Sequence, residues 1–343
     1  MNDYKYMVAT QCFTYNQKPY IEKTIQGFSM QKVNFPIVNI IVDDASFDGE
    51  AEWLRQWAND NLIKADDTSI WSVEDYGEVA VANNKYNKDQ TFVVLLLFEN
   101  HYKMGKNNLK LDYVKEWLDD SKYHALCEGD DYWIDPNKLQ MQVDFLESHP
   151  DYVLCHTDFN LSNGKRRNHE VYLRTDDDYF EVNVRTGIEI GTLTVLYRSE
   201  VYNRIPKKWI GKDWPMGDYP MWIELSHEGK IKYVPEVTAC YRITVESASH
   251  GTFEKEIKFA NATVEVRRFY ANYYGVELPR NGYSKGFFIS IMKKAYKHNR
   301  LDAAREFLGQ AKEHGLLNNK TRFFYLATCF KPLGWLLRRV YSA

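Results

Sequence analysis

The sequence lacks several features that would point to common functional classes. No stretch is apolar enough to span a bilayer, since the longest apolar run covers only residues 92–98. The first residues also lack the basic end and apolar core of a signal peptide. Five cysteines without Cys-x-x-Cys spacing argue against a disulfide framework or a zinc cluster. These absences predict a protein of the reducing cytoplasm.

A strong charge of one sign is absent too. The formal net charge is only −3, from 44 basic and 47 acidic residues, so no global field favours nucleic acid. Neither GxGxxG nor GxxxxGK[ST] follows the first apolar segment, which argues against dinucleotide and P-loop sites. Residues 9–12 do not supply the glycine-rich, basic loop of a nucleotidyl transferase either.

Apolar segments separated by helical patterns are present along most of the chain. With 343 residues, 44% of them hydrophobic, the chain can bury a large core. Their alternation predicts an α/β fold with a parallel sheet. Strands are expected at 7–12, 37–42, 91–98, 123–127, 152–156, 193–197, 231–234 and 238–242. Residues 60–90 are predicted to be an irregular insertion and 159–181 a surface excursion, and helices are expected at about 254–273, 284–298 and 301–314.

Two acidic clusters directly follow apolar strands, Asp43-Asp44 and Glu128-Gly129-Asp130-Asp131. Because open α/β sheets bind ligands at the carboxyl ends of their strands, both clusters are expected at one edge. Any single Asp-Asp pair is more often a solvated turn or a helix cap. Crowded carboxylates at a shared edge instead suit Mg²⁺ or Mn²⁺ holding a diphosphate.

Three motifs resemble, in order and spacing, those of family 2 glycosyltransferases. They are Thr14-Tyr15-Asn16, Ile41-Val42-Asp43-Asp44-Ala45-Ser46 with Asp48-Gly49, and Cys127-Glu128-Gly129-Asp130-Asp131-Tyr132-Trp133. Later segments at 135–140, 145–146, 217–222 and 241–249 extend the similarity, which covers roughly residues 6–250. The resemblance implies a GT-A fold: a Rossmann-like, mixed, mainly parallel sheet flanked by helices, with a C-terminal helical extension.

The resemblance also implies a domain division. Residues 1–250 would form the glycosyltransferase domain, with a nucleotide-binding half at about 1–135 and an acceptor half at about 136–250. Residues 251–343 would form a helical region that ends in a basic, aromatic tail.

Site residues follow from the same resemblance. The nucleotide diphosphate sugar would be bound by Thr14, Asn16, Asp43 or Asp44, Lys106 and Asp130. The metal, Mn²⁺ or Mg²⁺, would be held by Asp130, Asp131 and His250. Glu128 stands where the family usually has the first Asp of DxDD, which leaves direct ligation by Glu128 open. Alternatively, His250 is interpreted as a surface residue of its loop.

A general base is implied at Asp218, because the family's acidic motif reads Gly217-Asp218 here. An acceptor hydroxyl is a weak nucleophile, so a base that removes its proton lowers the barrier. A single displacement inverts the anomeric centre and needs no second carboxylate, unlike the paired acids of retaining hydrolases. Alternatively, Asp218 is only the N-cap of the helix that holds Trp222.

The function implied is inverting, metal-dependent transfer of a sugar from a nucleotide diphosphate donor, a UDP-sugar foremost, to a glycan hydroxyl. The acceptor would be a glycan or lipid-linked glycan of surface polysaccharide or lipopolysaccharide biosynthesis. The alternative is a non-catalytic protein of the same fold that binds sugar nucleotides or glycans. Asp218 and the Asp130-Asp131 pair favour the enzyme, because a binding protein needs neither.

The segment 320–343 is basic and aromatic and has no acid. It predicts either peripheral contact with the inner face of the cell membrane or a helix that packs its aromatic face on the protein. The sequence alone does not favour one over the other.

Overall fold

The computed structural model describes residues 4–64, 69–106, 108–164, 166–167, 179–187, 190–244 and 251–341. The chain forms two compact units. Unit 1 comprises Met1–Asp177, Ile190–Pro206 and Leu225–Ile243, and unit 2 comprises Asp178–Glu189, Lys207–Glu224 and Thr244–Ala343. Three segments of the predicted acceptor half, 178–189, 207–224 and 244–250, thus belong to the same unit as the C-terminal helices.

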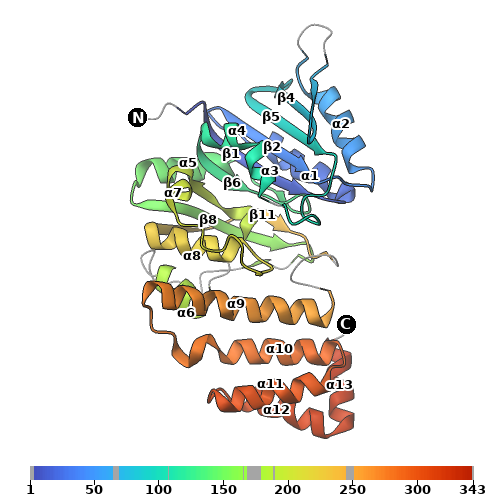
Figure 1. The fold of residues 1–343 in the computed structure, drawn as a ribbon, viewed down its shortest axis with the longest axis vertical. Helices are drawn as coiled ribbons and strands as arrows, with labels where there is room; N and C mark the ends of the chain where they lie inside the picture. Colours follow the sequence, from blue (N-terminus) through green and yellow to red (C-terminus); the bar gives the residue numbers. More distant parts are fainter. Residues whose placement is uncertain are drawn as a thin grey trace. The chain divides into compact units, whose positions relative to one another are not determined.

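Unit 1 is built on one mixed sheet of eleven strands in the described residues, with helices on its faces (Figure 1). Its strands run in the order β3-β4-β5-β2-β1-β6-β10-β8-β11-β7, and β9 pairs with β8. The strands are β1 (Tyr6–Thr14), β2 (Ile37–Asp43), β3 (Trp71–Glu74), β4 (Gly77–Asn84), β5 (Asn87–Leu97), β6 (Ser121–Leu126), β7 (Tyr132–Trp133), β8 (Tyr152–Leu161), β9 (Arg166–Arg167), β10 (Leu196–Arg198) and β11 (Lys230–Tyr241). The pairs β5-β2, β2-β1, β1-β6 and β8-β11 are parallel. The predicted α/β class with a mixed sheet flanked by helices is confirmed, and the four neighbouring strands β5, β2, β1 and β6 are parallel.

Both faces of the central strands are covered, which explains why β2 is buried along its whole length. On one face Val8 packs in a cluster with Ile25 of α1 (Lys18–Ser29) and Leu54 of α2 (Glu50–Asn61). On the other face the next residue, Ala9, packs with Leu118 of α4 (Lys115–Asp119). Successive side chains of a strand point to opposite faces, so one apolar run serves two core layers.

The prediction of an irregular insertion at 60–90 is wrong, because β3, β4 and the start of β5 form an antiparallel meander there. The segment reads as polar because β3 is the edge strand, where Val73 is 72% exposed. A Cβ at Gly77 would lie 2.3 Å from the Leu96 carbonyl oxygen, so this glycine allows the two backbones to approach. The two strands predicted at 231–234 and 238–242 are one strand, β11, which has register shifts and ends at Tyr241.

Unit 2 is helical in its described residues. Three further α-helices in the described residues belong to unit 1: α3 (Leu109–Tyr113), α5 (Lys138–Ser148) and α7 (Ser199–Arg204). The others are α6 (Tyr179–Thr186), α8 (Asp218–Glu228), α9 (Phe253–Tyr274), α10 (Lys285–Lys297), α11 (Leu301–Glu313), α12 (Asn319–Cys329) and α13 (Lys331–Tyr341). Helices α9, α10 and α11 confirm the three predicted after residue 252. Thr252 caps α9 by accepting from the Lys255 N–H, and Gly275 ends it in the left-handed region at φ 69°. In the described part of the chain, no helix is long and apolar enough to cross a membrane.

A buried carboxylate joins two helices of unit 2. Glu256 of α9 accepts hydrogen bonds from Lys294 Nζ at 2.9 Å and Lys297 Nζ at 2.8 Å, both on α10. His298 Nε2 lies 3.3 Å from the same carboxylate. Burial alone would raise the pKa of Glu256, but the hydrogen bonds from the two lysines outweigh it and lower the pKa to about 2. Ionised Glu256 therefore stabilises the packing of α9 on α10.

Replacing Glu256 by Gln should lower the free energy of unfolding by about 2 kcal/mol at pH 7, because the lysines lose their counter-charge. A carboxyl with a lowered pKa stabilises the fold above its unfolded pKa and loses this effect as the pH falls toward its folded pKa. The difference between the two proteins should therefore be full at pH 7 and shrink below about pH 4.5. Thermal melts across this range measure it. Glu254→Gln, which removes an exposed partner of Arg300, should change little, and equal losses in both variants would contradict the assignment.

Candidate functional site

The carboxyl ends of β1, β2 and β6 lie next to one another in unit 1. Thr14, the last residue of β1, is in register with Asp43, the last residue of β2. On the other side Gln11 pairs with Leu126, the last residue of β6. Because the three strands are parallel, the loops that carry the three sequence motifs start at one edge of the sheet.

Glu50 joins the first two motifs. Its fully buried carboxylate accepts from the Thr14 hydroxyl and, at 2.7 and 3.0 Å, from the Gln17 N–H and the Ser46 hydroxyl. Burial raises the pKa of Glu50 above its ordinary value. Sequence reasoning missed this residue, although its place directly after Asp48-Gly49, at the start of α2, was a usable signal.

Asn16 supports the second motif from the first. It takes the left-handed conformation at φ 54°, which Asn tolerates better than most residues. Its Oδ1 accepts from the Phe47 N–H at 2.9 Å, and its own N–H donates to the Ser46 hydroxyl at 2.8 Å. Beside it, Lys103 Nζ donates to the Tyr15 hydroxyl at 2.7 Å and lies 5.9 Å from the centre of the exposed Phe47 ring. The predicted nucleotide ligand Asn16 therefore also shapes an exposed aromatic surface.

Gly129 brings the third motif against the first. A Cβ on Gly129 would lie 2.3 Å from Thr14 Oγ1 and 2.4 Å from Gln17 Oε1, so only a glycine fits. Thr24 of α1 fixes the same loop by donating to the carbonyl oxygens of Gly129 and Asp131. The three motifs therefore meet around Thr14.

The adjacent acids Asp43 and Asp44 differ in their hydrogen-bond partners. Asp44 is used by the chain itself: its carboxylate accepts from the His101 and Tyr102 N–H groups and lies 3.1 Å from Lys110 Nζ. Asp43 accepts the Ser46 N–H through Oδ2, but its buried Oδ1 has no hydrogen-bond partner among the described residues. Burial raises the pKa of Asp43 to about 7. Of this pair, Asp43 is therefore the acid with a buried oxygen that lacks a partner among the described residues.

Lys110, which contacts Asp44 of this acidic pair, was not selected by sequence reasoning. Lys110 is buried on α3, whereas the predicted Lys106 is exposed in the preceding loop. A helical segment places residues four apart on the same face, so the two lysines could not be told apart from spacing alone. The structure gives Lys106 no side-chain hydrogen bond or ion pair among the described residues.

Asp130 and Asp131 lie in the loop after β6. The Arg242 N–H donates to Asp131 Oδ1 at 2.8 Å, and Arg242 Nη1 donates to the Asp130 carbonyl oxygen at 2.6 Å. The guanidinium carbon lies 4.4 Å from the centre of the Tyr132 ring. Burial raises the pKa of both carboxyls, and the neighbouring charge of Asp130 raises that of Asp131 further. A cation at this loop would relieve the repulsion.

The oxygen donors of this loop fit a hard divalent cation only in part. No group of three or more His, Cys, Asp or Glu side chains that could hold a metal occurs among the described residues. Two carboxylates can still suffice, because Mg²⁺ is commonly bound through one or two carboxylates together with substrate phosphates. Glu128 is exposed, and His250 lies outside the described residues.

Asp218 is the first residue of α8, and its Oδ1 lies 2.7 Å from the Tyr219 N–H. It belongs to unit 2, and its side chain is half-buried. The two nearest other acids have structural partners. Asp213 pairs with Lys258, and the buried Glu224 accepts from the Lys207 and Lys208 N–H groups and the Tyr270 hydroxyl. Asp218 also has structural partners, among them the Tyr219 N–H, and its role as the base stays a prediction from the sequence.

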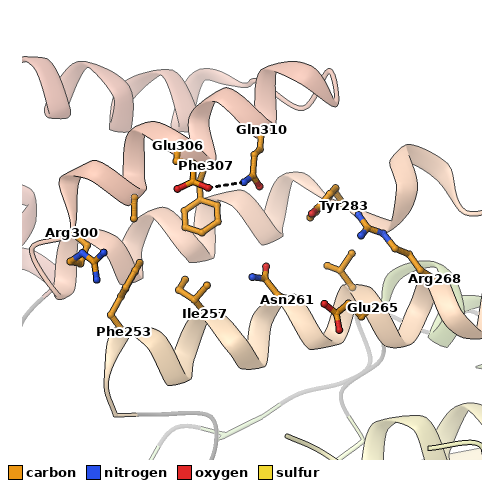
Figure 2. Close-up of a pocket in the computed structure, with 12 residues that line it drawn as sticks. Phe253, Ile257, Asn261, Glu265, Arg268, Tyr283, Arg300, Glu306, Phe307 and Gln310 are labelled. Atoms are coloured by element: carbon orange, nitrogen blue, oxygen red, sulfur yellow. Dashed lines mark hydrogen bonds between the residues drawn. The ribbon is translucent and has the colours of Figure 1, made fainter. Parts of the chain in front are cut away.

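Unit 2 also has a pocket of about 400 Å³ between α9 and α11 (Figure 2). Its apolar lining includes Phe253, Ile257 and Phe307, and polar side chains such as Asn261 and Gln310 also line it. None of the predicted site residues lines this pocket. It therefore adds nothing to the assignment of the site at the sheet edge.

Comparisons with known proteins fit this architecture. No protein-family model matches the chain. Uncharacterized proteins of Mycobacterium tuberculosis and Mycobacterium bovis are each 29% identical over 251 residues, 72% of this chain, and the matched region spans 61% of the length of those relatives.

Two solved structures share the fold, each with a TM-score of 0.50. TarS 1–349 of S. aureus in complex with UDP-GlcNAc is 12% identical over 98% of this chain and 90% of its own. The mannosyltransferase PcManGT from Pyrobaculum calidifontis, in complex with GDP-Man and Mn²⁺, is 16% identical over 99% of this chain and 85% of its own. The chain has the fold of these proteins, a mixed sheet flanked by helices with a helical C-terminal region.

The Gly129→Ala variant tests the close contact between the Gly129 backbone and the Thr14 side chain. The added methyl group would overlap the Thr14 side chain, so the free energy of unfolding should fall by about 1–3 kcal/mol as the loop is displaced. Thermal or chemical denaturation measures this loss. Gly309→Ala is the matched control, since a Cβ there meets nothing within 4 Å inside a helix, and this variant should be neutral or slightly stabilised. An unchanged stability of Gly129→Ala would show that the loop has room that the structure does not give it.

Proposed function

We propose that this protein is a family 2 glycosyltransferase of the GT-A type, which transfers a sugar from a nucleotide diphosphate donor to a hydroxyl of a glycan acceptor. The observation that carries the proposal is the meeting of three polar loops around Thr14 and Gly129, at the carboxyl ends of β1, β2 and β6. Ligands of open α/β sheets bind at this edge. The loops offer hydrogen-bond acceptors for a nucleoside and carboxylates for a metal-bound diphosphate, but no glycine-rich phosphate loop.

The donor is bound through the first two motifs. Asp43, rather than Asp44, accepts a hydrogen bond from the base or ribose, because its Oδ1 is buried without a partner among the described residues. A buried polar atom of this kind loses its hydration without compensation until a ligand supplies a donor. Thr14 and Asn16 shape the same place, and Lys106 approaches the diphosphate. The donor is foremost a UDP-sugar. The two structures of the same fold contain UDP-GlcNAc and GDP-Man.

Asp130 and Asp131 hold Mn²⁺ or Mg²⁺ together with the diphosphate of the donor, with His250 as a further candidate ligand. When bound, the metal offsets the negative charge that develops on the departing diphosphate. The chain prepares these carboxylates through Arg242, whose N–H fixes Asp131 Oδ1 and leaves Oδ2 for the cation. Arg242 and the backbone of the loop thus orient the acids before any ligand arrives.

Asp218 is the general base that accepts the proton of the acceptor hydroxyl as the oxygen attacks the anomeric carbon. The bond from that carbon to the diphosphate oxygen breaks as the new glycosidic bond forms, so the configuration inverts in one displacement. No covalent intermediate and no second carboxylate are needed. The hydrogen bond to the Tyr219 N–H holds the Asp218 carboxylate at the start of α8.

The donor is bound within residues 1–135 and the acceptor within 136–250. The acceptor is a glycan or lipid-linked glycan of surface polysaccharide or lipopolysaccharide biosynthesis, used in the cytoplasm at the inner face of the membrane. The described cysteines are free, which fits a reducing compartment. A lipid-linked acceptor requires the enzyme to reach a membrane surface.

Metal-dependent binding of nucleoside diphosphates tests the site. UDP or GDP should bind at least about tenfold more tightly with Mn²⁺ or Mg²⁺ than with a chelator, and Asp131→Asn should remove most of this gain. Asn can still accept the Arg242 N–H, so the variant removes charge without removing that hydrogen bond. Because the pKa of Asp131 is raised, protons compete with the metal and affinity should increase with pH. Titration calorimetry measures each quantity, with Asp135→Asn as a loop control that should bind normally. Equal affinity with and without metal would refute the metal assignment.

The Asp218→Asn variant distinguishes between two roles of Asp218, general base and helix cap. Asn keeps the shape and the acceptor for the Tyr219 N–H but cannot take a proton, so turnover should fall about a hundredfold or more while donor affinity and melting temperature persist. Sugar transfer, or slow donor hydrolysis if the acceptor is not in hand, measures turnover. Asp213→Asn, an exposed acid of the same segment, should retain activity. Normal turnover of Asp218→Asn would disprove the assignment, and donor binding without any turnover in the wild type would indicate the non-catalytic alternative.

A further inference from the structure

Helices α12 and α13 expose an unusual amount of apolar surface. Seven large side chains between Phe323 and Val340 are exposed, among them Phe330 at 62% and Trp335 at 59%. These seven exposed side chains, the outer face, are Phe323, Tyr325, Leu326, Phe330, Trp335, Leu336 and Val340. On α12, Phe323 and Leu326 follow the three-residue spacing of one helix face, and Phe330 is the extended residue between α12 and α13. Such a concentration of exposed apolar side chains marks an interaction site rather than ordinary surface.

The same two helices are anchored by their other side. Phe324, Ala327 and Leu337 are buried in a cluster with Met292 and Tyr296 of α10, and the Tyr296 hydroxyl donates to the Phe324 carbonyl oxygen at 2.6 Å. A Cβ at Gly334 would lie 2.6 Å from the Ala327 carbonyl oxygen, so this glycine lets α13 pack closely on α12. An Asn318 and Thr321 capping box begins α12. The aromatic residues of this segment are therefore divided between a packed side and the outer face.

Charge identifies the partner of the outer face. Residues 314–343 contain five basic residues and no acid. Among the described side chains, Lys320, Arg322 and Arg339 are exposed, and the Arg339 guanidinium carbon lies 4.9 Å from the centre of the Trp335 ring. An arginine that lies along an aromatic ring covers apolar surface while its charge stays in water. Apolar and aromatic side chains flanked by cations are the composition of helices that lie in the headgroup region of a membrane.

We propose that the outer face of α12 and α13 docks on an anionic lipid bilayer, with Trp335, Leu336 and Phe330 inserted between headgroups and the flanking cations on lipid phosphates. A second copy of the chain is a poorer partner, because two such faces would bring basic residues of the same sign together. Nucleic acid would leave Leu326, Leu336 and Val340 without apolar partners. This proposal stands on the exposed side chains and their charge, and it does not depend on sugar transfer.

Flotation with lipid vesicles tests the docking without donor or acceptor. The wild-type chain should bind vesicles of equal parts phosphatidylglycerol and phosphatidylcholine, bind pure phosphatidylcholine weakly, and dissociate at high salt. Trp335→Ser combined with Leu336→Ser should weaken binding about tenfold or more, since two apolar side chains no longer leave water. Arg322→Gln combined with Arg339→Gln should weaken binding about fivefold for each cation removed.

Matched variants control for general loss of apolar surface or charge. Val73→Ser combined with Ile210→Ser removes exposed apolar side chains elsewhere, and Lys255→Gln combined with Lys312→Gln removes exposed cations of α9 and α11. Both should bind vesicles like the wild type, and all variants should keep their melting temperature. Wild-type protein that stays off anionic vesicles, or outer-face variants that bind as well as the controls, would overturn the proposal. A third outcome would also overturn the proposal: a wild-type dimer that does not bind vesicles and that becomes a monomer when Trp335→Ser is combined with Leu336→Ser. That outcome would assign the outer face to contact between copies of the chain.

Discussion

The close approach of the Gly129 backbone to the Thr14 side chain is the constraint on which the site depends. It allows the loop after β6 to lie directly against the end of β1, where a side chain of any size would keep the two apart. Glu50 then ties the end of β1 to the loop after β2 through three hydrogen bonds. The three motifs are distant in sequence, but these two contacts hold them rigidly together, as preorganised binding requires.

This rigidity is obtained at an electrostatic cost. Asp43, Glu50, Asp130 and Asp131 all have raised pKa values, chiefly because they are buried. Lys110 lies on Asp44 rather than on these four acids, so the edge keeps acids whose charged forms are poorly compensated. Carboxylates in this state favour a ligand that brings a cation or hydrogen-bond donors, since binding then relieves repulsion already present in the folded chain. The same feature that destabilises the free protein favours ligand binding.

The sequence could predict the groups at the sheet edge because strand ends are visible in it. Apolar runs mark β1, β2 and β6, and the polar residues directly after each run must lie at one edge of a parallel sheet. It could not predict contacts that arise only in three dimensions. The roles of Glu50 and Gly129 depend on loops that fold back on each other, and Lys110 lies only four residues after Lys106 in the sequence. The meander of β3 and β4 was missed because the edge strand β3 has mostly exposed side chains, which weakens the apolar pattern expected of a strand.

Charge is also distributed unevenly along the chain, and this bears on how the protein would meet a membrane. Residues 314–343 contribute five positive charges and no negative one, so the rest of the chain carries a formal charge of −8 although the whole chain carries only −3. An anionic surface therefore attracts α12 and α13 and repels the remainder. The apolar outer face lies on the same two helices, so electrostatic attraction and apolar burial act at one place. A protein held in this way would contact the bilayer through the outer face of α12 and α13.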